Sequence, residues 1–127
     1  MPPSWPDDLY VLTSALGAVL ALLGALLVLW AVRELGHSFT PFPTPRDDGR
    51  LVATGPFVYV RHPIYAGGIL FAVGFALATS PAALVPTVGL ALLWTRKAAR
   101  EEEQLSRRFP EYADYRSRVP GRFLPSR

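Results

Sequence analysis

The sequence has 127 residues, half of them hydrophobic, and its 13 Lys and Arg exceed its 10 Asp and Glu. Two long stretches, residues 9–32 and 63–95, contain no charged residue, and every basic residue lies at or after Arg33. This pattern excludes a soluble globule, because about 20 consecutive apolar residues form a helix that crosses a bilayer. The lack of cysteine excludes disulfides, thiolate zinc sites and cysteine nucleophiles.

Residues 9–32 are predicted to form the first membrane span. The stretch exceeds the apolar core of a secretion signal, about 7–15 residues, and no Lys or Arg precedes it, so we expect it to be retained. Within it, Gly17, Ala21 and Ala25 recur every four residues as a stripe of small side chains. Such a stripe lets another helix approach closely, either inside the chain or from a second copy in a homo-oligomer.

Residues 33–62 form a polar connection that is long enough to indicate a functional role. Pro41, Pro43 and Pro45 forbid a regular helix and favour an extended or polyproline conformation. Residues 51–60 mix β-branched and aromatic side chains around Gly55 and Pro56. This segment is predicted to be strand-like or a turn at the membrane interface.

Residues 63–95 are too long for one straight span and contain Ser80 before Pro81. The residue before a proline avoids the helical region, so helices are expected over residues 64–79 and 81–95, joined as a hairpin. The polar tail, residues 96–127, should continue helically until Pro110 and add a turn or two afterwards. The predicted fold is all-α and polytopic: a single membrane domain of about three transmembrane helices.

The distribution of Lys and Arg predicts the orientation. The N-terminal flank has none, residues 33–62 have four and the tail has nine. The positive-inside rule then places the N-terminus outside, and both polar segments on the cytoplasmic side. The usage of Ala, Leu, Gly, Arg and Pro suggests a bacterial source, so the expected location is the bacterial inner membrane.

Polar residues gather at the start of the hairpin. Pro63 suits the first position of a helix, and Arg61, His62 and Tyr65 lie beside it. These residues could anchor the helix at the membrane interface. Alternatively, they could bind a polar or anionic ligand group at the positive end of the helix.

Three adjacent glutamates, residues 101–103, follow the hairpin on the exit helix. They are either a solvated charge run or carboxylates that hold a ribose, an ammonium or a sulfonium. At least one of them must point toward the bundle, because three consecutive positions sweep around a helix.

Other classes of site are not supported. His37 and His62 lack a helical metal-ligand spacing, so no metal centre is expected. Phosphate-binding loops, dinucleotide fingerprints and the hydrolase elbow are absent from the sequence. The basic tail suits anionic membrane lipids better than nucleic acid.

Two segments carry a family resemblance: LVATGPFVYVRHPIYAGG, and EEEQLSRRFPEYADYRSRVPGRFLP after the hairpin. Together they resemble the C-terminal signature of the isoprenylcysteine carboxyl methyltransferase and phospholipid methyltransferase superfamily, over residues 44–125. Pro110 departs from that signature, which has glycine after the phenylalanine.

The resemblance implies a site for S-adenosylmethionine, formed by the first motif and the tail. Carried over by position, the cofactor-binding residues are His62, Pro63, Tyr65, Gly67, Glu101, Glu102, Tyr112 and Tyr115. The catalytic candidates are Arg61, Glu102 and Arg118. In these roles Glu102 and His62 hold polar parts of the cofactor, and Arg61 and Arg118 orient an anionic acceptor. An amine acceptor instead requires a base, either Glu101 or Glu102.

The expected function is methyl transfer from S-adenosylmethionine to a lipophilic acceptor at the cytoplasmic face of the membrane. The acceptor is either the carboxylate of a prenylcysteine-like compound or a phospholipid amine. The competing hypothesis is a non-catalytic module that binds anionic lipid through its basic tail. A small transporter is disfavoured, because neither apolar stretch contains a charge.

Overall fold

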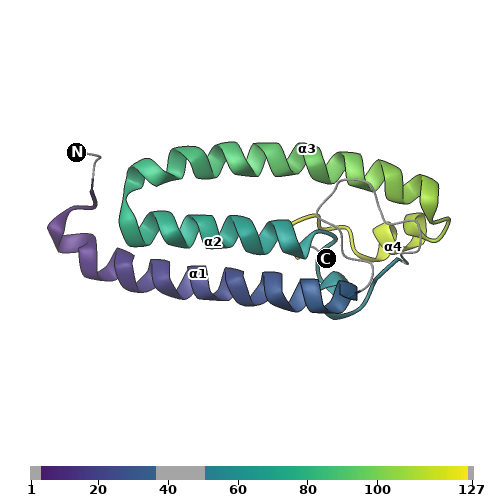
Figure 1. Cartoon of the computed structure of the whole chain (residues 1–127), viewed down its shortest axis with the longest axis horizontal. Coiled ribbons are helices and arrows are strands. Elements are labelled where there is room, and N and C mark those ends of the chain that lie inside the picture. The colour runs from purple at the N-terminus through teal and green to yellow at the C-terminus, as the bar shows by residue number, and fades with distance from the viewer. Residues whose placement is uncertain (1–3, 37–50, 126–127) are drawn as a thin grey trace.

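The computed structural model describes residues 4–36 and 51–125 of the chain. Three long helices lie lengthwise beside one another, with α2 (Pro63–Thr79) between α1 (Asp7–Leu35) and α3 (Leu84–Arg108) (Figure 1). The short helix α4 (Tyr112–Arg118) and two 3₁₀ turns, η2 (Gly55–Val58) and η3 (Pro81–Ala83), complete the described secondary structure. The part of the chain that the structure describes contains no strand, and the all-α prediction is confirmed.

Helix α1 contains the predicted first span and extends it at both ends. Asp7 and Asp8 lie in its first turn and Arg33 in its last, where each charge opposes the partial charge of the helix end. It has 29 residues, and the mean hydropathy of its 18-residue apolar window is 2.6, so it is long and apolar enough to cross a membrane. Only 17% of its most apolar window is buried inside the protein, so most of its apolar surface faces outward.

Glycines bring α1 and α2 into backbone contact. A Cβ atom added at Gly24 would lie 2.5 Å from the carbonyl oxygen of Gly67, and one added at Gly74 would lie 2.5 Å from that of Gly17. Glycine is thus required for the two backbones to approach this closely. The glycines recur at seven-residue spacing on both helices, which keeps them on one face of each.

The contact between α1 and α2 uses part of the predicted small-residue stripe. Gly17 and Ala21 face Gly74 of the same chain, whereas Ala25 is exposed. Gly24 rather than Ala25 continues the buried face, which ends at Ala31. The close helix approach expected from the stripe is confirmed inside the chain, because α2 packs on Gly17 and Ala21.

The turn between α2 and α3 follows from Ser80 and Pro81. The extended backbone of Ser80 ends α2, and its hydroxyl accepts a hydrogen bond from the backbone N–H of Ala82 at 3.2 Å. The chain then forms η3 before α3 begins at Leu84, three residues later than predicted. α3 continues without a break to Arg108, so the predicted helical exit from the hairpin is confirmed.

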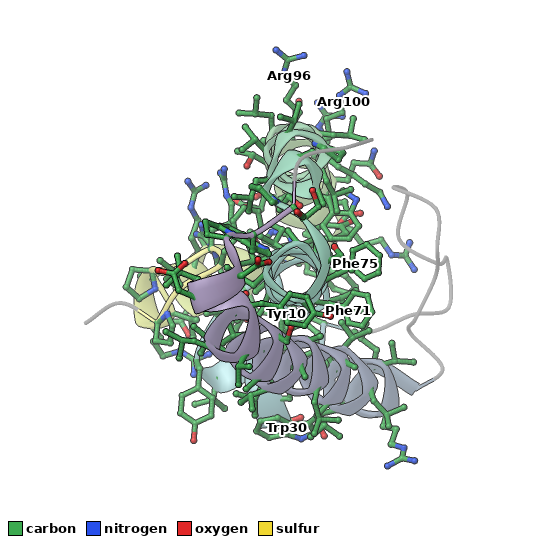
Figure 2. The ribbon with its side chains drawn as sticks, turned by 90° about the vertical axis from the view of Figure 1, so that its left-hand side faces the viewer. Tyr10, Trp30, Phe71, Phe75, Arg96 and Arg100 are labelled. Carbon is green, nitrogen blue, oxygen red and sulfur yellow. The ribbon has the colours of Figure 1, made fainter. Side chains whose placement is uncertain are left out.

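The helices expose large apolar side chains along much of their length. On α2 these include Phe71 and Phe75. On α3 they include Val85, Val88, Leu92 and Leu93. The charged part of α3 follows directly, and Arg96 and Arg100 project from the side of α3 that faces away from α2 (Figure 2). An apolar outer surface bordered by basic residues is typical of a membrane protein.

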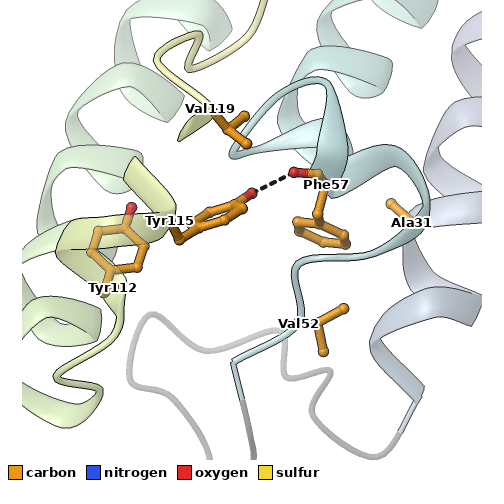
Figure 3. Close-up of a cluster of buried hydrophobic side chains, with 6 residues drawn as sticks. All are labelled: Ala31, Val52, Phe57, Tyr112, Tyr115 and Val119. Atoms are coloured by element: carbon orange, nitrogen blue, oxygen red, sulfur yellow. Dashed lines mark hydrogen bonds between the residues drawn. The ribbon is translucent and has the colours of Figure 1, made fainter. Parts of the chain in front are cut away.

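A buried hydrophobic cluster closes the end of the bundle where α1 ends and α2 begins (Figure 3). Its core consists of Ala31, Val52, Phe57, Tyr112, Tyr115 and Val119. The hydroxyl of Tyr115 donates a hydrogen bond to the backbone oxygen of Phe57 at 2.7 Å, which joins α4 to η2. The cluster therefore holds segments from both polar parts of the chain against α1.

Residues 51–60 form a turn, not a strand. Gly55 has a positive φ of 62°, a conformation that glycine adopts without strain, and Pro56 follows it inside η2. Thr54 donates a hydrogen bond from its hydroxyl to Glu34 at 2.5 Å and so attaches this turn to α1. The turn alternative is confirmed and the strand-like alternative is wrong, because a proline without an N–H cannot continue a strand ladder. The predicted polyproline segment lies outside the described residues.

Candidate active site

The candidate site lies at the end of the bundle that carries the hydrophobic cluster. Pro63 occupies the first position of α2 and is fully buried. The backbone N–H groups of Arg61 and His62 donate hydrogen bonds to the carbonyl oxygens of Gly121 and Arg122, each at 3.0 Å. The chain after α4 therefore runs along the residues that precede α2, so the two motifs meet.

Glu102 is the centre of a buried ionic cluster. One of its carboxylate oxygens lies 2.8 Å from Nε2 of His62 and 2.8 Å from Nε of Arg122. The other lies 3.4 Å from Nη2 of Arg61. The residue is only 3% exposed, so these contacts replace the water that the carboxylate lost on burial. The cluster joins α3, the start of α2 and the C-terminal segment.

The charges around Glu102 keep it ionised. Burial alone raises the pKa of this carboxyl, but hydrogen bonds to His62 and Arg122 and the positive charge of Arg61 lower it to about 2. Glu102 therefore remains a carboxylate at neutral pH and is a poor proton acceptor.

The cluster holds more positive than negative charge. The two guanidinium groups of Arg61 and Arg122 face the single carboxylate of Glu102. The Nε atom of Arg61 is buried, and within the described structure it has no hydrogen-bond partner. A buried N–H without a partner is costly, so this donor suits an anionic group of a ligand.

Glu101 lies beside this cluster in different surroundings. It accepts a hydrogen bond from the hydroxyl of Tyr65, and it lies 3.9 Å from Nδ1 of His62 and 3.9 Å from Nζ of Lys97. Its side chain is 20% exposed. Burial raises the pKa of Glu101 above its usual value, and the nearby charge of Glu102 adds to the rise. The contacts of Glu101 with Tyr65, His62 and Lys97 act against this rise without cancelling it.

Tyr65, the hydrogen-bond donor to Glu101, lies among other aromatic rings. The ring of Tyr65 stacks on His62 at a centroid distance of 5.7 Å and lies 5.2 Å from the ring of Trp94. Trp94 in turn packs against Gly68, where an added Cβ would overlap the indole. The ammonium group of Lys97 lies 5.1 Å from the centre of the Tyr65 ring.

The structure brings together most of the residues that the sequence singles out. Those that meet are Arg61, His62, Pro63, Tyr65, Glu101 and Glu102. Arg118 does not join them: its side chain is 63% exposed and pairs with Asp114 at 3.0 Å on the outer side of α4. Gly67 also faces elsewhere, toward Gly24 and Val28 of α1.

The two tyrosines of α4 belong to the hydrophobic cluster. Tyr115 is buried and uses its hydroxyl to bind η2. Tyr112 is buried as well, and its hydroxyl has no partner within the described structure. Burial, followed by the negative charge of Glu102, raises the pKa of Tyr112 to about 12. Tyr115 thus supports the site from the hydrophobic cluster, whereas Tyr112 lies close enough to the Glu102 cluster to be affected by its charges.

Sequence reasoning missed Arg122 and Trp94, and it indicated Lys97 only as an i, i+4 ion-pair partner of the glutamates. Trp94, Lys97 and Glu101 occupy positions i, i+3 and i+7 of one helix, a spacing that places them on one face and could have identified them. Arg122 carries no comparable signal, because it reaches Glu102 only when the chain folds back after α4.

Comparisons with known proteins show which proteins this chain is similar to. A family model for phospholipid methyltransferases matches residues 12–112, which include Arg61, His62 and both glutamates of the site. The protein-S-isoprenylcysteine O-methyltransferase of Saccharomyces cerevisiae is 33% identical over 85% of this chain and 47% of the yeast protein.

Two bacterial proteins are also similar. The cobalt-zinc-cadmium resistance protein CzcN of Cupriavidus metallidurans is 29% identical over 94% of this chain and 51% of its own length. The nickel-cobalt-cadmium resistance protein NccN of Alcaligenes xylosoxydans xylosoxydans is 36% identical over 61% of this chain and 38% of its own. The chain spans about half, or less, of each of these relatives. Since the family model covers most of the chain, this protein belongs to the phospholipid methyltransferase family.

Proposed function

We propose that this protein transfers a methyl group from S-adenosylmethionine to a lipophilic acceptor at a membrane surface. The observation that carries the proposal is the buried cluster around Glu102, which joins the two family motifs at one end of the bundle. This end lies where the apolar surface of α3 gives way to charge at Arg96. An acceptor held in lipid and a water-soluble cofactor can meet at such a boundary.

The charges of the site fit the cofactor. S-adenosylmethionine carries a carboxylate and two positive groups, and when bound it supplies an activated methyl on its sulfonium sulfur. The unpaired Nε–H of Arg61 suits an anionic group, and the carboxylate of Glu101 suits a cationic one. Methyl transfer between correctly placed atoms draws most of its acceleration from positioning and the exclusion of water. A rigid, buried cluster such as that of Glu102 provides positioning.

We further propose that α2 and the apolar part of α3 cross the membrane with α1. All three helices expose large apolar side chains, which favours lipid around them. α2 has 17 residues and is about 26 Å long, slightly less than the hydrocarbon core, so local thinning would accompany it. The basic residues at the site end support a cytoplasmic location for that end, and the membrane proposed is the bacterial inner membrane.

The acceptor classes proposed are a carboxylate of the prenylcysteine kind and a phospholipid amine. The name of the yeast relative supports the first class, and the family description supports the second. In both cases Arg61 and Arg122, rather than Arg118, are the guanidiniums placed to orient an anionic group, because they flank Glu102 inside the site.

The test is transfer of labelled methyl from S-adenosylmethionine in membranes that contain the protein, with products separated into base-labile esters, lipids and volatile compounds. We expect label with the wild type and with Glu103→Gln, because Glu103 is exposed and pairs only with Arg107 in the described structure. Glu102→Gln and Arg61→Lys should reduce transfer at least tenfold. Arg61→Lys keeps the positive charge. It therefore still tests whether the cluster is needed for methyl transfer if Glu102→Gln fails to fold.

The competing function is a non-catalytic module that binds anionic lipid. Such a module would show neither labelled product nor saturable affinity for S-adenosylhomocysteine in detergent. Equal transfer in the wild type and in folded Arg61→Lys and Glu102→Gln variants would contradict the proposed site.

A further inference from the structure

The charged part of α3 contains two arginines with no opposite charge beside them. Of the basic residues on this helix, Lys97 and Arg107 each pair with a glutamate four positions away. Arg108 lies over an aromatic ring, 5.8 Å from the ring centre. Arg96 and Arg100 are exposed, and neither forms an ion pair with a residue that the structure describes. Their two guanidinium groups therefore remain available to bind an anion.

Arg96 and Arg100 lie about one helical turn apart on the same face of α3. Figure 2 shows both side chains projecting from the side of α3 that faces away from α2. Side chains four positions apart on a helix are neighbours, with Cβ atoms about 5–6 Å apart. Each guanidinium presents parallel N–H groups that match the oxygens of a phosphate. The pair therefore fits a phosphodiester, whose negative charge is shared between two oxygens.

An exposed apolar surface continues along α3 from these arginines. Leu92, Gly89 and Val85 lie four, seven and eleven positions before Arg96, a spacing that keeps them on its face of the helix. A Cβ added at Gly89 would meet nothing within 4 Å, so none of the described residues covers this face. Large apolar side chains around Gly89 are between 59% and 75% exposed, namely those of Val85, Val88, Leu92 and Leu93.

We propose that this outer face of α3 binds one anionic phospholipid. The phosphate lies between Arg96 and Arg100, and an acyl chain runs along Leu92, Gly89 and Val85. Basic side chains that directly follow a membrane helix on the cytoplasmic side attract anionic headgroups. The inference rests on the proposed membrane position of α3, but it does not depend on methyl transfer.

The apolar surface favours a lipid over a free phosphate. A free phosphate ester would satisfy the two arginines and leave the adjoining apolar side chains exposed to whatever surrounds them. A phospholipid satisfies both parts of this face, because its charge and its acyl chains are joined at the level of the headgroup. The uncharged stretch ends at residue 95, so the arginines lie where the phosphate layer meets the hydrocarbon core.

The lipid proposed here is distinct from the methyl acceptor. The candidate active site uses the other side of α3, where Lys97 and Glu101 contact Tyr65 of α2. Lys97 directly follows Arg96, so a headgroup that holds Arg96 also fixes the level of α3 at the membrane surface. The bound phospholipid thus anchors the helix that carries the glutamates of the site.

The experiment measures lipid binding by native mass spectrometry in detergent, without S-adenosylmethionine. The probes are phosphatidylglycerol, phosphatidylcholine with the same acyl chains, and glycerophosphoglycerol, which is the first headgroup without chains. The test variant carries both Arg96→Gln and Arg100→Gln. The matched control carries Arg116→Gln and Arg118→Gln, which remove the same charge from α4, a helix described throughout that exposes no large apolar side chain.

We expect the wild type to bind one phosphatidylglycerol about tenfold more tightly than phosphatidylcholine. The double variant at Arg96 and Arg100 should lose this preference, whereas the control should keep it to within about twofold. Glycerophosphoglycerol should not displace the lipid. Added phosphatidylglycerol should raise the thermal stability of the wild type and of the control, but not that of the double variant, because a ligand stabilises only the protein that binds it.

Two results would overturn the proposal: equal affinity of the wild type for both lipids, and a preference for phosphatidylglycerol that survives in the double variant. Displacement of the lipid by glycerophosphoglycerol would also overturn it, because the arginines would then bind a phosphate ester without chains. The single variants Arg96→Gln and Arg100→Gln, each expected to weaken the preference about threefold, provide the test if the double variant fails to fold. Lipid preference without methyl transfer would refute only the proposed function, and methyl transfer without lipid preference would refute only this inference.

Discussion

Nε2 of His62 lies 2.8 Å from the carboxylate of Glu102, although 40 residues separate them in the chain. His62 immediately precedes α2 and Glu102 lies in the last third of α3, so the whole hairpin lies between them. The contact is possible because α2 and α3 run antiparallel and return the chain to the same end of the bundle (Figure 1). The hairpin therefore acts as the scaffold of the site.

Stability should depend on pH through Glu102. Its pKa is about 2 in the folded protein, against about 4.3 in an unfolded chain. A lowered pKa contributes stability that is fully present above the unfolded value and is lost as pH falls toward the folded value. The wild type should thus lose stability between about pH 5 and pH 2 more steeply than Glu102→Gln. Thermal unfolding in detergent across this range measures the difference, and equal slopes would contradict it.

Removing the same carboxylate at neutral pH should be costly. Glu102→Gln leaves Arg61 and Arg122 buried or partly buried without their counter-charge, for which about 3–5 kcal/mol is typical. Glu103→Gln serves as the control and should stay within about 0.5 kcal/mol of the wild type. The free energy of unfolding from denaturant titration provides both values. A Glu102→Gln protein as stable as the control would show that the buried cluster is not structural.

Arg122 and Arg118 offer a matched pair of arginines near the C-terminus. Arg122→Ala removes hydrogen bonds to Glu102 and should cost about 1.5–3 kcal/mol, reduced by the partial exposure of Arg122. Arg118→Ala removes an exposed pair with Asp114 and should cost less than about 1 kcal/mol. Thermal stability and affinity for S-adenosylhomocysteine should both decline only for Arg122→Ala. A larger loss of stability and of affinity for Arg118→Ala than for Arg122→Ala would mean that Arg118 belongs to the site.

Contact between α1 and α2 should not tolerate a side chain at Gly17. A Cβ there would lie 2.5 Å from the backbone nitrogen of Ala78, and backbone atoms cannot move aside cheaply. Gly17→Ala should therefore destabilise the protein by about 1–3 kcal/mol. Gly89→Ala is the control, because a Cβ at Gly89 meets nothing within 4 Å. Gly89→Ala should be neutral or slightly stabilising in the same thermal assay, since alanine favours a helix over glycine.

The hydroxyl groups of Tyr115 and Tyr112 should differ in their contribution to stability. Tyr115→Phe removes a buried hydrogen bond to Phe57 and leaves that carbonyl poorly satisfied, at a cost of about 1–3 kcal/mol. Tyr112→Phe removes a hydroxyl that has no partner in the described structure, so stability should stay equal or rise. Denaturant titration gives the free energy of unfolding of each variant and so measures this difference. A larger loss for Tyr112→Phe would mean that its hydroxyl has a partner in the folded protein.

Much of the fold could be predicted because its signals are local. The uncharged stretches determine α1 and the hairpin, and the Ser80–Pro81 pair marks the turn. The helical exit to Arg108 follows from its composition and from Pro110. The strand-like alternative for residues 51–60 failed because Gly55 and Pro56 form a 3₁₀ turn there. The β-branched and aromatic residues of this segment favoured the strand, whereas Gly55 and Pro56 favoured the turn that forms.

The candidate site could be predicted only in part. The motif residues Arg61, His62, Glu101 and Glu102 were identified from sequence and do lie together. The predicted roles of Gly67 and Arg118 do not match their positions, because one face of α2 is occupied by α1 and α4 turns Arg118 outward. Position within a motif says which residues are near in the chain, but not which face of a helix each one occupies.

By itself, the sequence determined the class of the protein: apolar helices bordered by basic residues, with the motifs of a methyltransferase family. Only the tertiary structure decided that the three adjacent glutamates differ in exposure and in ion-pair partners, and that Arg122 binds Glu102. Helix formation depends on neighbours a few positions apart, whereas a buried ion pair depends on where packing places distant segments. Here the close contacts at Gly17 and Gly68 hold α2 against α1 and α3, and backbone hydrogen bonds from Arg61 and His62 hold the segment that carries Arg122.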